Sequence, residues 1–145
     1  MEVTIPDLTG AECGDIAITA AEGGIGYWSQ IERYDWSRWS PSTLHDQYIK
    51  GEVPASNLDV ADDFVFYTIH EMDDDEMGYK PEGIDITAAL IKKGFERCLA
   101  APKDKGGWAA QGLLPTARED WMGEIDSDVA DLIIQFGVFG EPKWG

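Results

Sequence analysis

Apolar residues recur at helical spacing near the start of the chain. Thr9, followed three positions later by Glu12, is typical of a capping box, in which each side chain bonds the backbone N–H of the other residue. The apolar stripe continues to Gly23, and glycine is the common residue just beyond a helix end. The pattern therefore predicts a first helix over residues 9–22.

Two further helices are predicted in the second half of the chain. Residues 87–101 repeat apolar positions every three or four residues, and Pro102 ends that helix. Residues 128–139 are apolar almost all round, with Ser127 as the expected N-cap and Gly140 just past the helix end. A helix without a polar face is typical of a buried position, so the last helix is expected at the centre of the core.

Residues that favour β-structure concentrate in two stretches, 25–34 and 64–70. The second stretch has apolar side chains on both faces, which indicates a central strand. Between them a short helical turn is predicted at residues 55–61, and the lysine- and glycine-rich residues 103–112 are expected to form a mobile loop. This order of elements favours an α+β fold, a small antiparallel sheet with about three helices packed on it. A parallel βαβ arrangement is the alternative.

Length and composition fit a single globular domain covering residues 1–145, because 43% hydrophobic and 27% charged residues are ordinary for a folded chain. No eighteen apolar residues run together and no basic leader opens the sequence, so we expect a cytoplasmic protein without a membrane segment. Cys13 and Cys98 are the two cysteines. They favour two buried reduced thiols over a disulfide framework or a zinc site.

The chain carries an unusually large excess of acidic over basic residues. Twenty-eight acids and eleven bases give a net charge of -17, which repels phosphate backbones, so direct nucleic-acid binding is not expected. Two long stretches, residues 51–79 and 119–142, contain sixteen of these acids and no Lys or Arg. If the two stretches share a face, the result is a surface of a single sign that would suit a basic partner protein. Salt adaptation is the alternative, although seven of the eleven bases are lysines.

One run of adjacent acids stands out after the central strand: Asp73, Asp74, Asp75 and Glu76. Carboxylates suit calcium or magnesium, but the run lacks the alternating ligands and the central glycine of an EF-hand loop. A solvated hairpin tip and an anionic contact surface are the other interpretations. No metal ion and no cofactor is predicted.

A second acidic set, Glu124, Asp128 and Asp131, has spacings of four and three residues, which would align the carboxylates on one helix face. Such a row resembles a ladder of phosphates. The competing interpretation is structural, because acids in the first turn of a helix complement the positive end of the helix dipole.

Five aromatic residues lie within thirteen positions: Tyr27, Trp28, Tyr34, Trp36 and Trp39. They could form core, a partner-binding patch or a pocket for a ring-containing ligand. Trp36 and Trp39 have polar neighbours and are the two expected at the surface.

Catalytic signatures are absent from the sequence. His45 and His70 are the two histidines, and neither lies in a nucleophile elbow, a metal motif or a triad order. The strand position of His70 favours a structural role. We therefore expect a protein that is not an enzyme.

Three short stretches resemble features of small uncharacterised proteins carried by bacteriophages and prophages: GIGYW at residues 24–28, DVAD at 128–131 and FG at 139–140. That resemblance implies no catalytic residue and no cofactor. In size and acidity the chain is also similar to phage anti-defence proteins that mimic DNA, among them anti-CRISPR and anti-restriction proteins.

These observations favour a phage-type accessory protein that binds and inhibits a basic host protein that handles nucleic acid, by mimicking the charge of DNA. The expected contact residues are Asp73, Asp74, Asp75, Glu76, Glu124, Asp128, Asp131, Trp36 and Trp39. A module that sequesters a nucleotide-like molecule, with Arg33, Arg38 and Lys92 or Lys93 on its phosphate, is the first alternative. A structural or oligomeric protein whose acids serve solubility is the second.

Overall fold

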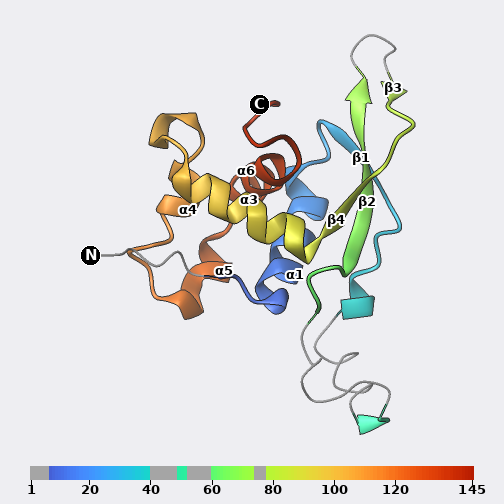
Figure 1. Cartoon of the computed structure of the whole chain (residues 1–145), viewed down its shortest axis with the longest axis horizontal. Coiled ribbons are helices and arrows are strands. Elements are labelled where there is room, and N and C mark those ends of the chain that lie inside the picture. Colours follow the sequence, from blue (N-terminus) through green and yellow to red (C-terminus); the bar gives the residue numbers. More distant parts are fainter. Residues whose placement is uncertain (1–6, 40–48, 52–59, 74–77) are drawn as a thin grey trace.

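The computed structural model describes residues 7–39, 49–51, 60–73 and 78–145, and places a layer of helices against one side of a small sheet (Figure 1). The sheet has four strands: β1 (Ser29–Glu32), β2 (Val65–Asp73), β3 (Gly78–Tyr79) and β4 (Ile84–Thr87). The predicted α+β fold with an antiparallel sheet is confirmed, and the parallel alternative is excluded for these strands because every pairing is antiparallel.

Strand β2 is the central strand, as its two apolar faces predicted. It pairs with each of the three other strands, β1, β3 and β4. A register shift between Val65 and Tyr67 interrupts the pairing with β4. The hydroxyl of Tyr67 reaches the helical layer, where it donates to the carbonyl of Ala17 at 2.8 Å. The predicted strand at residues 25–34 is shorter than expected, because the backbone at Ile25 turns and accepts bonds from Trp28 and Ser29.

The first helix, α1 (Gly10–Thr19), begins at the predicted capping box. The Glu12 backbone donates to the Thr9 hydroxyl at 3.1 Å, and the Thr9 backbone donates to the Glu12 carboxylate at 2.8 Å. The helix widens into a π-helical turn, η1 (Ala20–Gly24), before it ends. Gly24 is required in that turn, since a Cβ there would lie 2.8 Å from the carbonyl oxygen of Ser127.

Helices α3 (Ala88–Ala100) and α6 (Ser127–Phe139) pack against each other in the middle of the helical layer (Figure 1). Both were predicted, and the last helix is buried as expected, with Ile133, Ile134 and Gln135 fully covered. The predicted N-cap of α6 is wrong by one residue, because the side chain that accepts from Val129 belongs to Asp126 and not to Ser127.

Short helical segments occupy connections in which the sequence pattern predicted no helix. They are 3-10 turns η2 (Trp36–Trp39), η4 (Lys103–Lys105) and η5 (Arg118–Asp120), and helices α4 (Trp108–Gln111) and α5 (Trp121–Glu124). The mobile loop predicted at residues 103–112 is wrong, since Ala109 and Ala110 are buried there and the Gln111 side chain donates to two carbonyls of the preceding segment. The turn predicted at residues 55–61 falls mainly outside the described residues.

Candidate functional site

The predicted row of Glu124, Asp128 and Asp131 does not exist as one helix face. Glu124 is the last residue of α5, and the backbone at Ile125 is extended, so the chain changes direction before α6 begins. Asp128 lies exposed in the first turn of α6. Asp131 is only 8% exposed and points into the protein. The prediction of Asp131 as a partner contact is therefore corrected.

Asp131 is instead the centre of a buried hydrogen-bond network. Its carboxylate accepts from the Trp28 indole at 2.8 Å, from the Tyr27 hydroxyl at 2.6 Å and from the Gln135 amide at 2.9 Å. Burial, followed by the bond to Asp131, raises the pKa of the Tyr27 phenol above its usual range. Tyr27 therefore keeps its proton at neutral pH and is unsuited to act as a base or nucleophile.

The two tryptophans predicted at the surface differ in how far they are exposed to solvent. Trp36 is 51% exposed, as expected, whereas Trp39 is only 6% exposed. The Trp39 ring stands edge-on to Phe66, with centroids 5.1 Å apart, and lies over Gly14, where a Cβ would be 2.8 Å from the indole. Trp39 is thus a core residue, and its prediction as a partner contact is wrong.

The acid run after the central strand is described only at its first residue. Asp73 ends β2 opposite Gly78 of β3, and Asp74, Asp75 and Glu76 lie outside the described residues. Trp36 belongs to η2, whose Arg38 and Trp39 contact the opposite end of β2. Eight residues of strand span about 26 Å. The structure therefore separates Asp73 from Trp36 instead of bringing them together.

One group of predicted acids, in the second base-free stretch, is exposed in the structure together with its acidic neighbours. This surface consists of five exposed carboxylates between η5 and the first turn of α6, here named the α5–α6 acidic surface: Glu119, Asp120, Glu124, Asp126 and Asp128. The nearest base in sequence, Arg118, is engaged elsewhere, since its guanidinium binds the Glu12 carboxylate at 2.7 Å and the Asp7 carbonyl. Within the described ranges, none of the five carboxylates forms an ion pair.

Three members of this surface, Glu119, Asp120 and Asp126, were not among the predicted contact residues. The feature of the sequence that could have identified them is their position in the base-free stretch 119–142. Helical spacing drew attention to Asp131 instead, because spacing alone does not reveal which face of a helix is buried.

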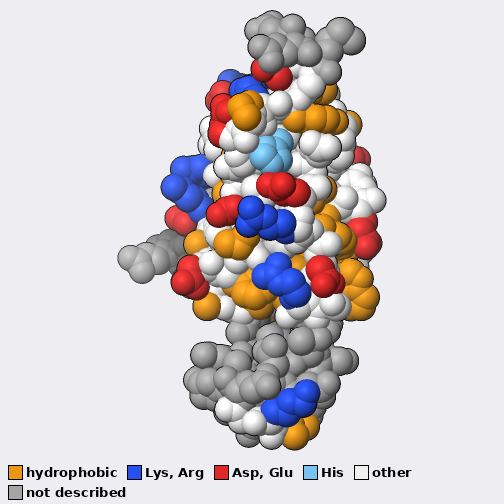
Figure 2. Space-filling model, turned by 90° about the vertical axis from the view of Figure 1, so that its right-hand side faces the viewer, with side chains coloured by type: hydrophobic (Ala, Val, Ile, Leu, Met, Phe, Trp, Pro, Cys, Tyr) orange, Lys and Arg blue, Asp and Glu red, His pale blue; other side chains and the backbone are white. Residues whose placement is uncertain are grey.

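Two of the four acids that the structure describes in the first base-free stretch are paired with bases. Asp62 binds Lys92 at 2.6 Å, and the buried Glu71 binds both Lys80 and Lys143. On the sheet side of the molecule, acidic and basic side chains alternate, with hydrophobic groups between them (Figure 2). The described residues on that side therefore form no surface of a single sign.

His70, the histidine with a described environment, has a structural setting. Its Nδ1 lies 2.9 Å from the Lys80 carbonyl and its Nε2 lies 2.9 Å from the Glu32 carboxylate. Both partners accept hydrogen bonds, so the ring fits best when both nitrogens carry protons. The bond to Glu32, then the bond to Lys80, raises the pKa of His70.

The cysteines also lack the setting of reactive groups. Both are buried, and burial raises the pKa of the Cys98 thiol to about 11. Among the residues that the structure describes, no three carboxylate, histidine or cysteine side chains form a group that could hold a metal ion.

Two of the cations proposed for a nucleotide site already have partners within the protein. Arg38 stacks on the Phe64 ring at 5.1 Å and donates to the Val65 carbonyl, while Lys92 is on α3 and binds Asp62. The aromatic segment between residues 27 and 39 gives its rings mainly to packing, with Trp28 and Trp39 in the core.

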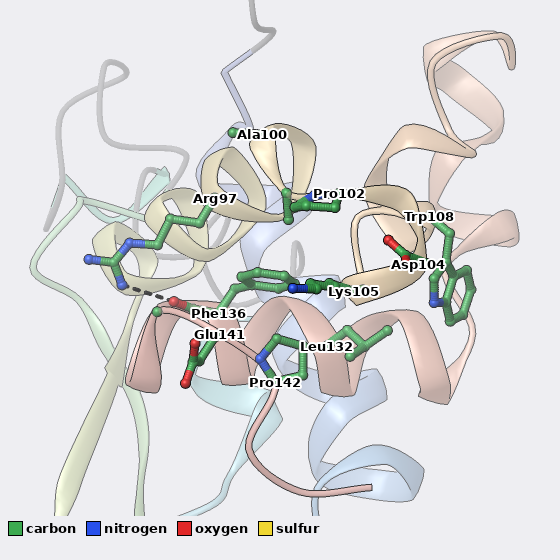
Figure 3. Close-up of a pocket in the computed structure, with 13 residues that line it drawn as sticks. Arg97, Ala100, Pro102, Asp104, Lys105, Trp108, Leu132, Phe136, Glu141 and Pro142 are labelled. Atoms are coloured by element: carbon green, nitrogen blue, oxygen red, sulfur yellow. Dashed lines mark hydrogen bonds between the residues drawn. The ribbon is translucent and has the colours of Figure 1, made fainter.

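A cavity of about 760 Å³ lies elsewhere, between the end of α3, the η4 segment and α6 (Figure 3). Its lining includes Arg97, Lys105, Trp108, Leu132 and Phe136. None of these residues was predicted as a site residue, because the cavity depends on how α3 and α6 are arranged.

The chain matches no protein-family model, no curated protein sequence and no solved structure. Of the helices in the described parts of the chain, none combines the length and the apolar character that crossing a bilayer requires.

Proposed function

We propose that this protein is a cytoplasmic accessory protein of the phage anti-defence type, which binds a basic protein that handles nucleic acid and competes with its DNA or RNA. The observation that supports this most is the α5–α6 acidic surface. Five exposed carboxylates lie within ten residues there, without an ion pair to any described base.

Helix stabilisation explains only part of this surface. Asp126 caps α6, and Asp128 lies in its first turn, where negative charge complements the helix dipole. Glu119 and Glu124 lie in helical turns of only three and four residues, and neither side chain makes a capping hydrogen bond. Like charges that crowd together repel one another and oppose folding, and a basic partner would remove that repulsion.

The proposed contact set is smaller than the sequence suggested. Asp131 and Trp39 are excluded because they are buried. Asp73 and Trp36 lie at opposite ends of β2 and so do not form one contact patch with each other, and Asp74, Asp75 and Glu76 lie outside the described residues. Glu124 and Asp128 remain, together with the other members of the α5–α6 acidic surface. Charge attraction then steers the encounter, so binding should weaken steeply as salt screens it over a Debye length of about 10 Å at 0.1 M.

The experiment is a displacement assay with defined basic partners. A fluorescent 20-base-pair duplex is bound to a catalytically inactive CRISPR effector with its guide, to a restriction enzyme, or to a bacterial nucleoid protein, and the acidic chain is added. We expect release of the duplex from at least one partner at 50 mM salt, a weaker effect at 300 mM salt, and no binding of the chain to the duplex alone. If the chain displaces the duplex from none of the three partners, the proposal is contradicted.

A further inference from the structure

The cavity between α3 and α6 has the size and composition of a small-molecule site. Its volume of about 760 Å³ falls within the range of about 300–1,000 Å³ that is common for ligand pockets. Much of its lining is apolar: Ala100, Ala101, Pro102, Trp108, Leu132, Phe136 and Pro142. Trp108 is 44% exposed at this lining.

The walls of the cavity are held in place by contacts that do not involve a ligand. Gly106 has a left-handed backbone with φ 99°, and a Cβ there would lie 2.9 Å from Pro142 and 3.0 Å from the Phe136 ring. The Cys98 thiol donates to the Gly106 carbonyl at 3.3 Å. The Gln111 amide donates to two carbonyls at the end of α3. A ligand would therefore enter a site that is already formed, which reduces the entropic cost of binding.

The cavity lining carries two bases and two acids, whereas the chain as a whole is strongly acidic. Residues 97–118 contain four bases and one acid, in a protein whose net charge is -17. Two of these bases, Arg97 and Lys105, line the cavity. Arg97 partly serves the fold, since its Nη1 donates to the Phe136 carbonyl at 2.9 Å. Lys105 forms no ion pair with any residue that the structure describes.

Two acids, Asp104 and Glu141, also line the cavity. They lie toward its two sides in Figure 3, whereas Lys105 extends from η4 toward the Phe136 ring in the middle. Lys105 is exposed at this apolar floor and pairs with neither acid, so an anionic group attached to an apolar body would supply it with a partner.

We propose that this cavity binds a small amphipathic anion, a molecule with a flat apolar body and one carboxylate, sulfonate or phosphate group. The apolar body packs on Phe136 and Leu132, and the anionic group pairs with Lys105. The site shares no residue with the α5–α6 acidic surface, so the failure of one proposal does not decide the other.

The test uses three probes of one shape: naphthalene-2-carboxylate, 2-naphthalenemethanol and 2-naphthylmethylammonium. Calorimetry gives each affinity, and ¹⁵N-resolved NMR shifts locate each probe. We expect the carboxylate to bind at least fivefold more tightly than the alcohol and the ammonium compound, with the largest shifts at the backbone amides of Lys105 and Trp108. No binding at 1 mM, or equal binding of all three probes, would overturn the proposal.

Two matched variants make the test specific. Lys105→Glu and Lys103→Glu change the net charge equally, and both lysines are exposed in η4, but Lys103 is not part of the cavity lining. We expect Lys105→Glu to weaken carboxylate binding at least fivefold and Lys103→Glu to change it less than twofold. Similar losses in both variants would show a general field effect and contradict the assigned site. Unchanged NMR spectra away from η4 establish that each variant is folded.

Discussion

The Trp28 indole N–H donates to the Asp131 carboxylate across 2.8 Å, although the two residues are 103 positions apart in the chain. The bond joins the turn before β1 to the middle of α6. Because the carboxylate also accepts from Tyr27 and Gln135, both of its oxygens are engaged in the fold.

Replacement of Asp131 by Ala should therefore destabilise the protein. The change leaves the buried indole N–H of Trp28 without its acceptor, and we expect the free energy of unfolding to fall by about 3 kcal/mol. Asp128→Ala is the matched control, one helical turn earlier and exposed, where loss of the favourable dipole interaction should cost less than about 1 kcal/mol. Urea denaturation followed by tryptophan fluorescence measures both. Equal losses would contradict the assigned structural role of Asp131.

The crossing of α3 and α6 depends on a second close contact, between Gly94 and Gly137. A Cβ on Gly94 would lie 2.9 Å from the Gly137 backbone nitrogen and would overlap the carbonyl oxygen of Ile133. Gly94→Ala should thus force the helices apart and cost about 3 kcal/mol. Gly123→Ala in α5 is the control, because nothing lies within 4 Å of its Cβ position, and this change should stabilise by up to about 1 kcal/mol. If Gly94→Ala leaves the free energy of unfolding unchanged, the two helices are not packed as closely as this contact requires.

The environment of His70 predicts a pH dependence of stability. Because the pKa of His70 is raised above its usual 6.5, its contribution is complete below pH 6.5 and is lost as pH rises through the higher value of the folded state. NMR titration of the ring should give a pKa above 6.5, and Glu32→Gln should lower it. A measured value below 6.5 in the unaltered protein would refute the bond to Glu32.

Glu71 predicts the opposite dependence at acid pH. Burial alone would raise its pKa, but hydrogen bonds from Lys143, Lys80 and Trp144 outweigh burial and hold the pKa below its usual 4.5. Its contribution is present above pH 4.5 and is lost as pH falls through the lower folded value. We expect Glu71→Gln to cost about 2 kcal/mol at pH 7. The difference from the unaltered protein should shrink below pH 4, and a difference that is constant with pH would contradict this assignment.

The elements that the sequence predicted well are those determined by neighbours in the chain. The capping box of Thr9 and Glu12, the apolar periodicity of α3 and α6, and the two apolar faces of β2 all depend on residues a few positions apart. Local rules were therefore sufficient for the fold class and for the central strand.

The residues that were predicted wrongly are determined by contacts across the chain. Asp131 is buried because Tyr27 and Trp28 fold over it from more than 100 positions away. Trp39 is buried because Gly14 leaves room for its ring. Neither contact has a signal in the local sequence. The same holds for the cavity beside Lys105, whose lining comes from α3, η4, α4 and α6.

The proposed function requires that charge on one particular surface, and not net charge alone, binds the partner. Two triple variants separate these possibilities. Glu119→Gln, Glu124→Gln and Asp128→Asn neutralise the α5–α6 acidic surface. Their matched control neutralises three exposed acids elsewhere: Glu82, Glu96 and Asp63. Each triple removes three negative charges and contains two glutamates and one aspartate.

The decisive measurement is the concentration of each triple variant that displaces half of the labelled duplex from a partner that the unaltered protein displaces. We predict that neutralising the α5–α6 acidic surface raises this concentration at least tenfold, while the control triple changes it less than twofold. Equal shifts for the two triples would show that net charge alone is responsible, and would contradict the claim.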